Sequence, residues 1–350
     1  MTLGYLDLLE LIKDEQITRP SSKDILPQPA SLDVPLTAEI YRMPASILPK
    51  KGQKVRELAS RALYQVPGNQ PLEPGNYYLI RADLDLNLKN INGTANNKSS
   101  SGRINLQTRL VLDGIDMFDT IPTGYKGEVW VEVHPQLAPV LHPEILNQIR
   151  FREGIDILKG SELINAHKKT PFLYIEDKPC DLILNQNSDA ILVGVDMLNT
   201  GWKGKLSRDT VINMSSKNND SSLFFERINQ KNSLILRKDE FYILGSYQKV
   251  CNPPEYCITM TPFGAEHGEF RSHFAGFFDP GNGVGTNGFT VTMEVIPIED
   301  AIEISHKQTM FSIQVERLKT PCPESALYGT NSHYLNDSGP RLAKFFQACR

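Results

Sequence analysis

The hydrophobic residues of this chain fall mainly in short alternating runs that Gly, Pro, Asn or Asp residues separate. The clearest runs are "NYYLI" (76–80), "GEVWVEV" (127–133), "AILVGVDM" (190–197), "FYILG" (241–245) and "GFTVTMEV" (288–295). Alternation of apolar and polar positions is typical of half-buried strands, and many short strands with frequent turns indicate a sandwich or barrel. The pattern therefore predicts an all-β (mainly) fold.

Helical periodicity is limited to the two ends of the chain. The first 16 residues, "MTLGYLDLLELIKDEQ", place Leu8, Leu9, Leu11 and Ile12 on one side of a short amphipathic helix. Acidic residues interrupt this apolar stripe, so we do not expect a secretory signal. Residues 340–348 are the second candidate helix.

The predicted strands recur in the same order in the two halves of the chain. "SLDVPL" (31–36) corresponds to "VGVDML" (193–198), "EPGNYYLI" (73–80) to "RKDEFYIL" (237–244), and "GYKGEVWVEV" (124–133) to "GTNGFTVTMEV" (285–295). A spacing near 163 residues is too long for a solenoid and indicates a duplicated domain. We expect domains at 1–160 and 161–350, one composite site per pair of copies, and an exposed loop at 214–225 within the second copy.

Composition and charge narrow the class of protein. At 350 residues with a net charge of −4 and 22% charged residues, the chain is ordinary for a globular protein and offers no field for a nucleic acid polymer or an anionic membrane. No apolar run is long enough to span a bilayer, and a cytoplasmic protein is the simplest interpretation. The five cysteines form no C-x-x-C pair and are expected as buried thiols. His267 and His273 are the closest histidines but lack a third ligand, so no metal site is expected.

The segment "KSSSGR" (98–103) is the first candidate for chemistry. Its hydroxyls and backbone amides are groups that can wrap phosphate oxygens, and Lys98 and Arg103 supply positive charge. The segment lacks the G-x-x-x-x-G-K-[ST] pattern, and no helix clearly follows it. A solvated turn and a phosphate-binding loop both remain open on the residues alone. The glycine-rich "GNGVG" (281–285) follows no βα pattern and predicts only turns.

Glu132 is the second candidate. Alternation in "GEVWVEVHP" places Val129, Val131 and Val133 on one face, with Glu128, Trp130 and Glu132 on the other. The carboxylate of Glu132 is either a solvated edge position or a partly buried general base with a raised pKa. A zinc-dependent deaminase mechanism is not expected, because no H-x-E pairs with a P-C-x-x-C motif.

These segments together resemble a known family. "QPASLDVPL" (28–36), "NNKSSSGR" (96–103), "GYKGEVWVEV" (124–133) and "LNQIRF" (146–151) are similar to the dCTP deaminase family of the dUTPase-like superfamily. "GEFRSHFAGFFDPGNG" (268–283) is similar to the long two-domain bacterial form, and "YGTNSHYLNDSGPRLAK" (328–344) to the C-terminal segment that closes over bound nucleotide. The resemblance implies two distorted β-barrel or jelly-roll domains with a C-terminal lid.

The resemblance also implies the site. Glu132 corresponds to the general base that activates water for attack at C4 of cytosine without zinc, and Ser99 and Arg103 correspond to its positioning groups. Mg²⁺ is implied as the companion of the triphosphate, with dTTP or dUTP as further possible ligands and self-association as the expected state. The implied substrate-binding residues are Lys98, Ser100, Ser101, Gly102, Trp130, Val131, Arg271, Asp279, Tyr328, His333 and Asp337.

The sequence departs from the family pattern at several positions. Pro122 stands where the family has an aspartate near the sugar or base, and Asp279 of the second copy is a candidate substitute. His333 and Asp337 stand where lysine and glutamine are usual, which leaves the phosphate contacts there open. Glu294 matches Glu132 by repeat position, but its copy lacks the K-S-S-x-x-R loop, so a structural role or a degenerate site is expected. A bifunctional enzyme that also forms dUMP and a non-catalytic nucleotide sensor remain alternatives.

Overall fold

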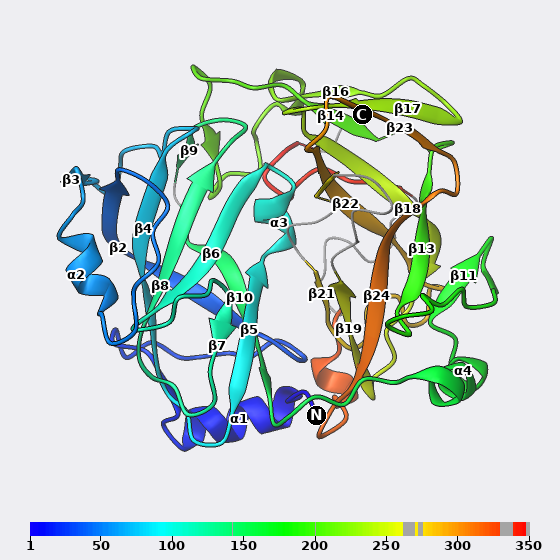
Figure 1. Ribbon diagram of the computed structural model, residues 1–350, viewed down its shortest axis with the longest axis horizontal. Helices are drawn as coiled ribbons and strands as arrows, with labels where there is room; N and C mark the ends of the chain where they lie inside the picture. Colours follow the sequence, from blue (N-terminus) through cyan, green and yellow to red (C-terminus); the bar gives the residue numbers. More distant parts are fainter. Residues whose placement is uncertain (142, 200, 262–269, 272–275, 330–338, 348–350) are drawn as a thin grey trace. The chain divides into compact units, whose positions relative to one another are not determined.

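The computed structural model describes residues 1–141, 143–199, 201–261, 270–271, 276–329 and 339–347, and it is built mainly of strands (Figure 1). The chain divides into two compact units. The first unit comprises Thr2–Gly154, Leu206–Phe224 and the end of the chain from Ala343, and the second comprises Ile155–Lys205 and Phe225–Leu342. The expected all-β class is confirmed.

The first unit contains a nine-stranded antiparallel sheet in the order β6-β8-β4-β2-β10-β5-β7, with β1 beside β4 and β3 beside β2, and a separate two-stranded parallel sheet of β9 and β15. Short helices lie at its margins. Its strands are β1 (Ile17–Thr18), β2 (Leu32–Met43), β3 (Tyr64–Gln65), β4 (Tyr77–Asn87), β5 (Asn92–Asn97), β6 (Leu106–Leu112), β7 (Thr120–Ile121), β8 (Lys126–Pro135), β9 (Val140–Leu141), β10 (Ile145–Arg152) and β15 (Ile212–Asn213). Its helices are α1 (Tyr5–Lys13), α2 (Val55–Ala59), α3 (Ser99–Gly102) and the 3-10 turn η1 (Ser221–Leu223).

The second unit contains an eleven-stranded sheet whose central order is β12-β11-β18-β13-β24-β19-β21, with β22 beside β18, and a separate two-stranded sheet of β17 and β23. Its strands are β11 (Leu173–Ile175), β12 (Lys178–Pro179), β13 (Ile191–Asp196), β14 (Trp202–Gly204), β16 (Phe225–Arg227), β17 (Ser233–Arg237), β18 (Tyr242–Val250), β19 (Tyr256–Thr261), β20 (Phe270–Arg271), β21 (Phe277–Phe278), β22 (Phe289–Pro297), β23 (Ala301–Ser305) and β24 (Thr309–Arg317). Its helices are α4 (Gly160–Lys169) and the 3-10 turn η3 (Glu324–Ala326).

The two units repeat one strand order, as the sequence predicts. The series β8-β4-β2-β10-β5-β7 of the first unit corresponds to β22-β18-β13-β24-β19-β21 of the second. The register agrees in detail: Glu132 lies opposite Leu79 on β4, and Glu294 lies opposite Ile243 on β18. The duplication therefore extends to the pairing of individual residues.

In each unit one strand pairs with one neighbour along its first part and with another along its second part. The residues of β2 up to Pro35 pair with β10, and those from Leu36 onward pair with β4. Proline has no N–H to donate, which suits a position where the strand leaves one ladder for another. The same division occurs in β13, between its pairing with β24 and its pairing with β18.

The ends of the chain meet the sequence expectations in part. The N-terminal helix is present with Leu8 and Leu11 buried, although Leu9 is 37% exposed. The prediction of a helix at 340–348 is wrong for residues 340–347, which are the described part of this segment. Phe346 instead forms a parallel β-bridge with Asn219, and the backbone around it is extended or turned.

The Ser/Asn-rich segment at 214–225 is also placed differently from expectation. Most of it belongs to Leu206–Phe224, which groups with the first unit rather than with the second copy. Its strand β15 pairs in parallel with β9, where Ile212 lies opposite Val140. Polar composition predicted a loop, but it did not predict to which unit this loop is bound.

The turns and thiols agree with expectation where they are described, whereas helix α4 lies in a segment for which the sequence predicted no helix. Residues 280–286 form turns between β21 and β22 rather than a helix. Cys251, Cys257 and Cys322 are buried free thiols and Cys180 is a half-buried one, whereas Cys349, like His267 and His273, lies outside the described residues. Within the described ranges, no helix has the length and apolarity that crossing a bilayer requires.

Candidate active site

The Lys98–Arg103 loop is an ordered, largely buried turn of helix. Lys98 precedes α3, and the amides of Ser101 and Gly102 donate to the Lys98 carbonyl over 3.0 and 3.1 Å. Asn105 ends the turn with φ at 50°, a left-handed conformation that asparagine tolerates better than most residues. Ser101, Gly102 and Arg103 are buried, so the solvated-turn interpretation does not describe this loop.

The loop is fixed to the strands beside it. The Lys98 amide donates to the Leu146 carbonyl on β10 over 2.9 Å, and the Ser101 hydroxyl donates to the same carbonyl over 3.2 Å. The Lys98 ammonium forms a 2.5 Å ion pair with Asp33 on β2. Sequence reasoning did not identify Asp33 as a partner, because the two residues are 65 positions apart.

Buried side-chain amides and a hydroxyl form hydrogen bonds between the strands that flank the loop. The side chain of Asn97 donates to the Leu106 carbonyl over 2.8 Å and accepts from the Thr108 hydroxyl over 2.7 Å. Asn147 donates to that hydroxyl in turn, over 3.2 Å. Hydrogen-bonded buried polar groups specify a single arrangement. These bonds therefore fix Asn97, which precedes the loop, against Leu106 and Thr108, which follow it.

Glu132 lies inside the first unit, on strand β8. Its side chain is 4% exposed, because both faces of β8 are covered at this level. One carboxylate oxygen accepts from the Ser46 hydroxyl over 2.8 Å, and the other accepts from the Ile47 amide over 2.9 Å. Of the two interpretations that the sequence left open, the structure supports burial rather than a solvated edge.

The electrostatic environment of Glu132 raises its pKa. Burial is the largest cause; the hydrogen bonds from Ser46 and Ile47 and the charge of Arg109 oppose it, and Asp119 adds to it. Arg109 lies directly opposite on β6 and forms a 2.8 Å ion pair with Asp119. A carboxylate with a raised pKa, held by two donors, is suited to exchange protons near neutral pH.

This environment predicts the pH dependence of any reaction in which Glu132 is the base. Glu132 must be ionised to accept a proton, so kcat falls as the pH drops through its raised pKa, and the acid limb lies above the ordinary value of 4.5. Arg109 lowers this pKa, so Arg109→Gln should move the acid limb to higher pH. Arg61→Gln, a change at an exposed position of the same unit, should leave the limb in place. An unchanged limb in Arg109→Gln would contradict this description.

The same shift has a consequence for stability. A carboxyl group whose pKa is raised on folding contributes stability that is complete below its unfolded pKa and is lost as the pH rises through its folded pKa. Replacement of Glu132 by glutamine removes this dependence.

The structure does not bring Glu132 to the Lys98–Arg103 loop of the same unit. Leu106 lies opposite Pro135 and Arg109 opposite Glu132, so three strand residues, about 10 Å, separate the level of Glu132 from the start of β6. Arg103 precedes that start. Among the described residues, no hydrogen bond joins Glu132 to Ser99 or Arg103.

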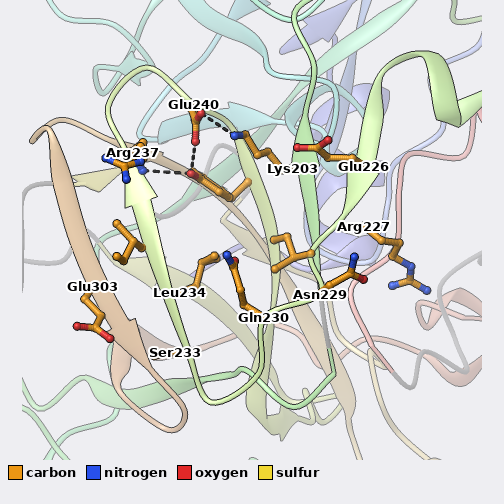
Figure 2. A pocket seen from close by; sticks show the side chains of 13 residues that line it. Lys203, Glu226, Arg227, Asn229, Gln230, Ser233, Leu234, Arg237, Glu240 and Glu303 are labelled. Atoms are coloured by element: carbon orange, nitrogen blue, oxygen red, sulfur yellow. Dashed lines mark hydrogen bonds and ion pairs between the residues drawn. The ribbon is translucent and has the colours of Figure 1, made fainter.

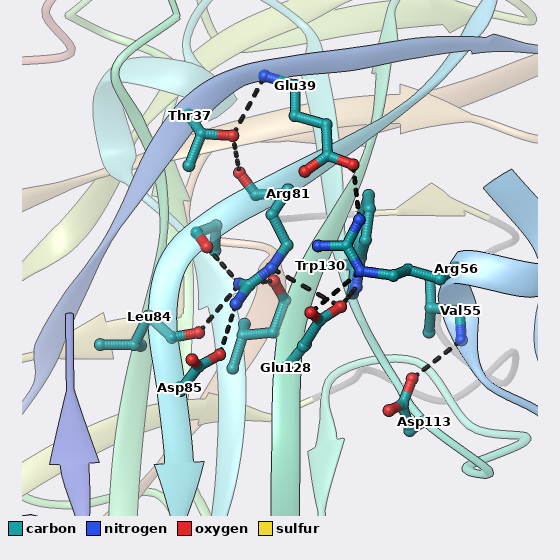
Figure 3. Close-up of polar contacts among 12 residues, drawn as sticks. Thr37, Glu39, Val55, Arg56, Arg81, Leu84, Asp85, Asp113, Glu128 and Trp130 are labelled. Carbon is teal, nitrogen blue, oxygen red and sulfur yellow. Dashed lines mark hydrogen bonds and ion pairs between the residues drawn. The ribbon is translucent and has the colours of Figure 1, made fainter. Parts of the chain in front are cut away.

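Trp130 is a core residue in this conformation. It is fully buried and packs in a cluster with Met43, Val55, Leu79 and Val111. Figure 3 shows Glu128 between the guanidinium groups of Arg56 and Arg81 close to the indole. The Trp130 N–H donates to Glu128 over 3.1 Å, and Glu128 pairs with Arg56 at 3.0 Å.

Val131, the neighbouring candidate, points to the opposite face of β8. It is fully buried, and its backbone pairs with Ile80 on β4 and Leu110 on β6. A substrate contact at Val131 therefore stays a prediction.

In the second unit, two predicted residues come close together. Asp279 follows β21 and begins the turn at Pro280–Gly281, and the Tyr328 amide donates to the Pro280 carbonyl over 2.8 Å. Gly281 has φ at +93°, and a Cβ there would lie 2.8 Å from the Tyr328 nitrogen, so only glycine allows this approach. Asn252 braces the turn with a 2.7 Å hydrogen bond to the Phe278 carbonyl.

The remaining candidates are separate from this turn or outside the described residues. Arg271 is exposed on the short strand β20, which pairs with the far end of β22, and Glu294 is buried on β22. Ser99 and Ser100 are half-buried on α3. His333 and Asp337 lie outside the described residues.

A hollow of about 700 Å³ lies in the second unit, and none of the predicted site residues is among the described residues that line it (Figure 2). Lys203 pairs with Glu240 at 2.6 Å, and Tyr242 donates to the other oxygen of Glu240. Burial favours a higher pKa for Glu240, but the hydrogen bonds from Lys203 and Tyr242 outweigh it and lower the pKa. The charges of Lys203 and Glu240 are thus paired with each other within the hollow.

Acidic, histidine and cysteine side chains do not gather in threes at metal-binding distance anywhere in the part of the chain that is described. In the first unit, the Lys98–Arg103 loop and the buried Glu132 are the candidate groups for chemistry.

Comparison with known proteins identifies the family. A model of the 2'-deoxycytidine 5'-triphosphate deaminase (DCD) N-terminal domain matches residues 2–155, and a model of the C-terminal domain matches residues 161–346. The chain belongs to the dCTP deaminase family. A crystal structure of 2'-deoxycytidine 5'-triphosphate deaminase from Agrobacterium tumefaciens is 31% identical, with a TM-score of 0.85 over 94% of this chain and 99% of that one. No curated protein gave a significant match.

The family match confirms the resemblance to the long two-domain form, since both domain models match consecutive halves of the chain. It also confirms that the chain is an enzyme of the dCTP deaminase type.

Proposed function

We propose that this chain deaminates dCTP to dUTP and ammonia without zinc, with Glu132 as the general base. Membership of the family supports the substrate and the reaction. The observation that carries the residue assignment is the buried Glu132 carboxylate, whose pKa is raised and whose orientation Ser46 and Ile47 fix.

In the proposed reaction, Glu132 removes a proton from a water molecule as its oxygen attacks C4 of cytosine. A C–O bond forms, the C4–N3 double bond becomes single, and Glu132 delivers the proton it took from water to N3. Glu132 then takes the proton of the new C4 hydroxyl and passes it to the amino nitrogen, the C4–N bond breaks, and ammonia leaves as the carbonyl of uracil forms. The carboxylate ends the cycle ionised, so atoms and charges balance.

The hydrogen bonds to Glu132 leave room for this role. An ionised carboxylate has about four acceptor positions, and Ser46 and Ile47 use two of them. The donors hold the carboxylate in one orientation, which favours proton transfer along a fixed line. A substrate water would use a remaining position.

Ser99 and Arg103 are the proposed positioning groups. Because about 10 Å of strand separates Glu132 from the loop within one unit, we infer that the loop acts on a nucleotide together with a glutamate of another chain. The family resemblance implies sites at subunit interfaces, and self-association is the corresponding expectation here. Mg²⁺ enters as part of the triphosphate substrate, whose oxygens the Lys98–Arg103 loop would contact.

The product assay separates this function from its alternatives. The full chain is incubated with dCTP and Mg²⁺, and ammonia, dUTP, dUMP and pyrophosphate are followed. Ammonia with dUTP is the expected result. Pyrophosphate with dUMP would instead support the bifunctional enzyme, and the absence of all four products with nucleotide still bound would support a sensor.

A further inference from the structure

Two segments that are distant in the sequence meet on the first unit. The Asn219 amide donates to the Phe345 carbonyl over 3.3 Å, and the Asn219 side chain donates to the same carbonyl over 2.7 Å. The Gln347 amide returns a 3.1 Å hydrogen bond to the Asn219 carbonyl, and the Phe346 ring lies 5.7 Å from that of Phe224. The chain end is thus bound to the inserted segment Leu206–Phe224.

The inserted segment is in turn bound to the barrel of the first unit. The Met214 amide donates to the Leu141 carbonyl over 3.0 Å, beside the β15–β9 pairing. Asn219 also accepts from the Asn213 amide over 3.0 Å and donates to the Asn213 carbonyl over 2.9 Å, which closes the loop that carries Lys217. The position of Lys217 is therefore set by the backbone on both sides of it.

These contacts gather three lysines. Lys217 lies two residues before Asn219, and Lys344 immediately precedes Phe345, so the hydrogen bonds between Asn219 and Phe345 bring both lysines to one place. Partial desolvation of its ammonium and the charges of Lys98 and Lys217 lower the pKa of Lys344, although part of the residue stays exposed, and only Asp33 acts in the opposite direction. Asp33 already pairs with Lys98 at 2.5 Å.

The local charge is opposite to that of the whole chain. Three ammonium groups and one carboxylate give a local excess of two positive charges, whereas the net charge of the chain is −4. Like charges at close range repel, and a bound polyanion relieves that repulsion. Lysine is well suited to this role, because its ammonium binds phosphate oxygens as a point charge from several directions.

We propose that Lys98, Lys217 and Lys344 form a polyphosphate subsite that holds the triphosphate of the nucleotide. This inference rests on the proposed function for the identity of the nucleotide. It adds two residues that lie outside the loop, one from a segment inserted in the second half of the sequence and one from the chain end. Substrate binding and the contact between the inserted segment and the chain end should therefore stabilise each other.

The test measures binding of inorganic tripolyphosphate to the full chain by calorimetry at about 0.1 M salt, where exposed charges are partly screened. Lys217→Met and Lys344→Met should each weaken this binding about 5- to 10-fold, the effect of one partly exposed charged contact. Both residues are exposed, so neither change should unfold the chain. Lys51→Met, at an exposed lysine of the same unit, is the matched control and should bind as the unmodified chain does.

The outcomes separate the subsite from the proposed reaction. Unchanged tripolyphosphate affinity in both variants would overturn the subsite, even if dCTP is deaminated. Weakened affinity together with no release of ammonia from dCTP would support the subsite and contradict the function. Deoxycytidine, which carries no phosphate, should bind the two variants and the unmodified chain equally, and weaker binding to the variants would show that the lysines do not act through phosphate.

Discussion

Replacement of Glu132 by glutamine should lower the rate of ammonia release from dCTP by about 10²–10⁴, because the amide cannot take a proton from water. Glutamine keeps the size of the side chain and an oxygen that accepts from Ser46 or Ile47. The fold should therefore survive, and dCTP should still bind. The rate is measured by single-turnover ammonia release, and binding by calorimetry on the same preparation.

Ser46→Ala is the matched control for this substitution. It removes one donor to the carboxylate but leaves the base itself, so the rate should fall far less than in Glu132→Gln. The Ser46 hydroxyl lowers the pKa of Glu132, and its loss should also move the acid limb to higher pH. Equal losses of rate in the two variants would mean that orientation, and not proton transfer, explains the effect of Glu132.

Replacement of Trp130 by alanine should lower the free energy of unfolding by about 3–5 kcal/mol, since it empties a fully buried site. The indole projects from β8 and packs against residues of β4, β6 and segment 43–62. Its N–H donates to Glu128. Denaturant unfolding of the full chain measures the change. Tyr64→Ala, at an aromatic residue that is 48% exposed in the same unit, should change the stability by less than about 0.5 kcal/mol.

Trp130→Phe distinguishes a core role from a substrate contact. Phenylalanine keeps much of the apolar packing of the core. If the indole does not contact the substrate, its replacement removes no binding interaction, so the KM for dCTP should stay within about twofold of the original. A large rise in KM with stability retained would assign the indole to the substrate instead, as the family resemblance suggested.

Strands and their duplication were predictable because alternation is a local property of the sequence. Glu132 and Glu294 occupy equivalent positions because both follow an alternating run, and their partners Leu79 and Ile243 match as well. The burial of Glu132 was not predictable in this way, because alternation left a solvated edge and a buried position open, and it is the fold that covers both faces of β8.

Tertiary pairing explains what the sequence did not predict. The helix expected at 340–348 would have required hydrogen bonds within the segment, but Phe345 and Gln347 make theirs with Asn219. Asn219 lies in a segment whose composition alone suggested a solvated loop. Nothing local in either segment indicates the other.

The candidate site was predictable to the same extent. The Lys98–Arg103 loop and Glu132 stand out by residue type and position, and the loop proved ordered. Asp33, Ser46 and Arg109 became visible only through contacts across the sheet. Arg109 had a usable signal, since its alternating strand follows the loop directly, but the register that sets it against Glu132 is a property of the fold.

The most direct test of the central claim compares the two equivalent glutamates. Ammonia release from dCTP is measured under identical conditions for Glu132→Gln and Glu294→Gln, which change the same position of the repeat in the two units. We predict that release is lost in Glu132→Gln and retained in Glu294→Gln. Retained release in Glu132→Gln, with loss in Glu294→Gln, would place the base in the second unit and contradict this account.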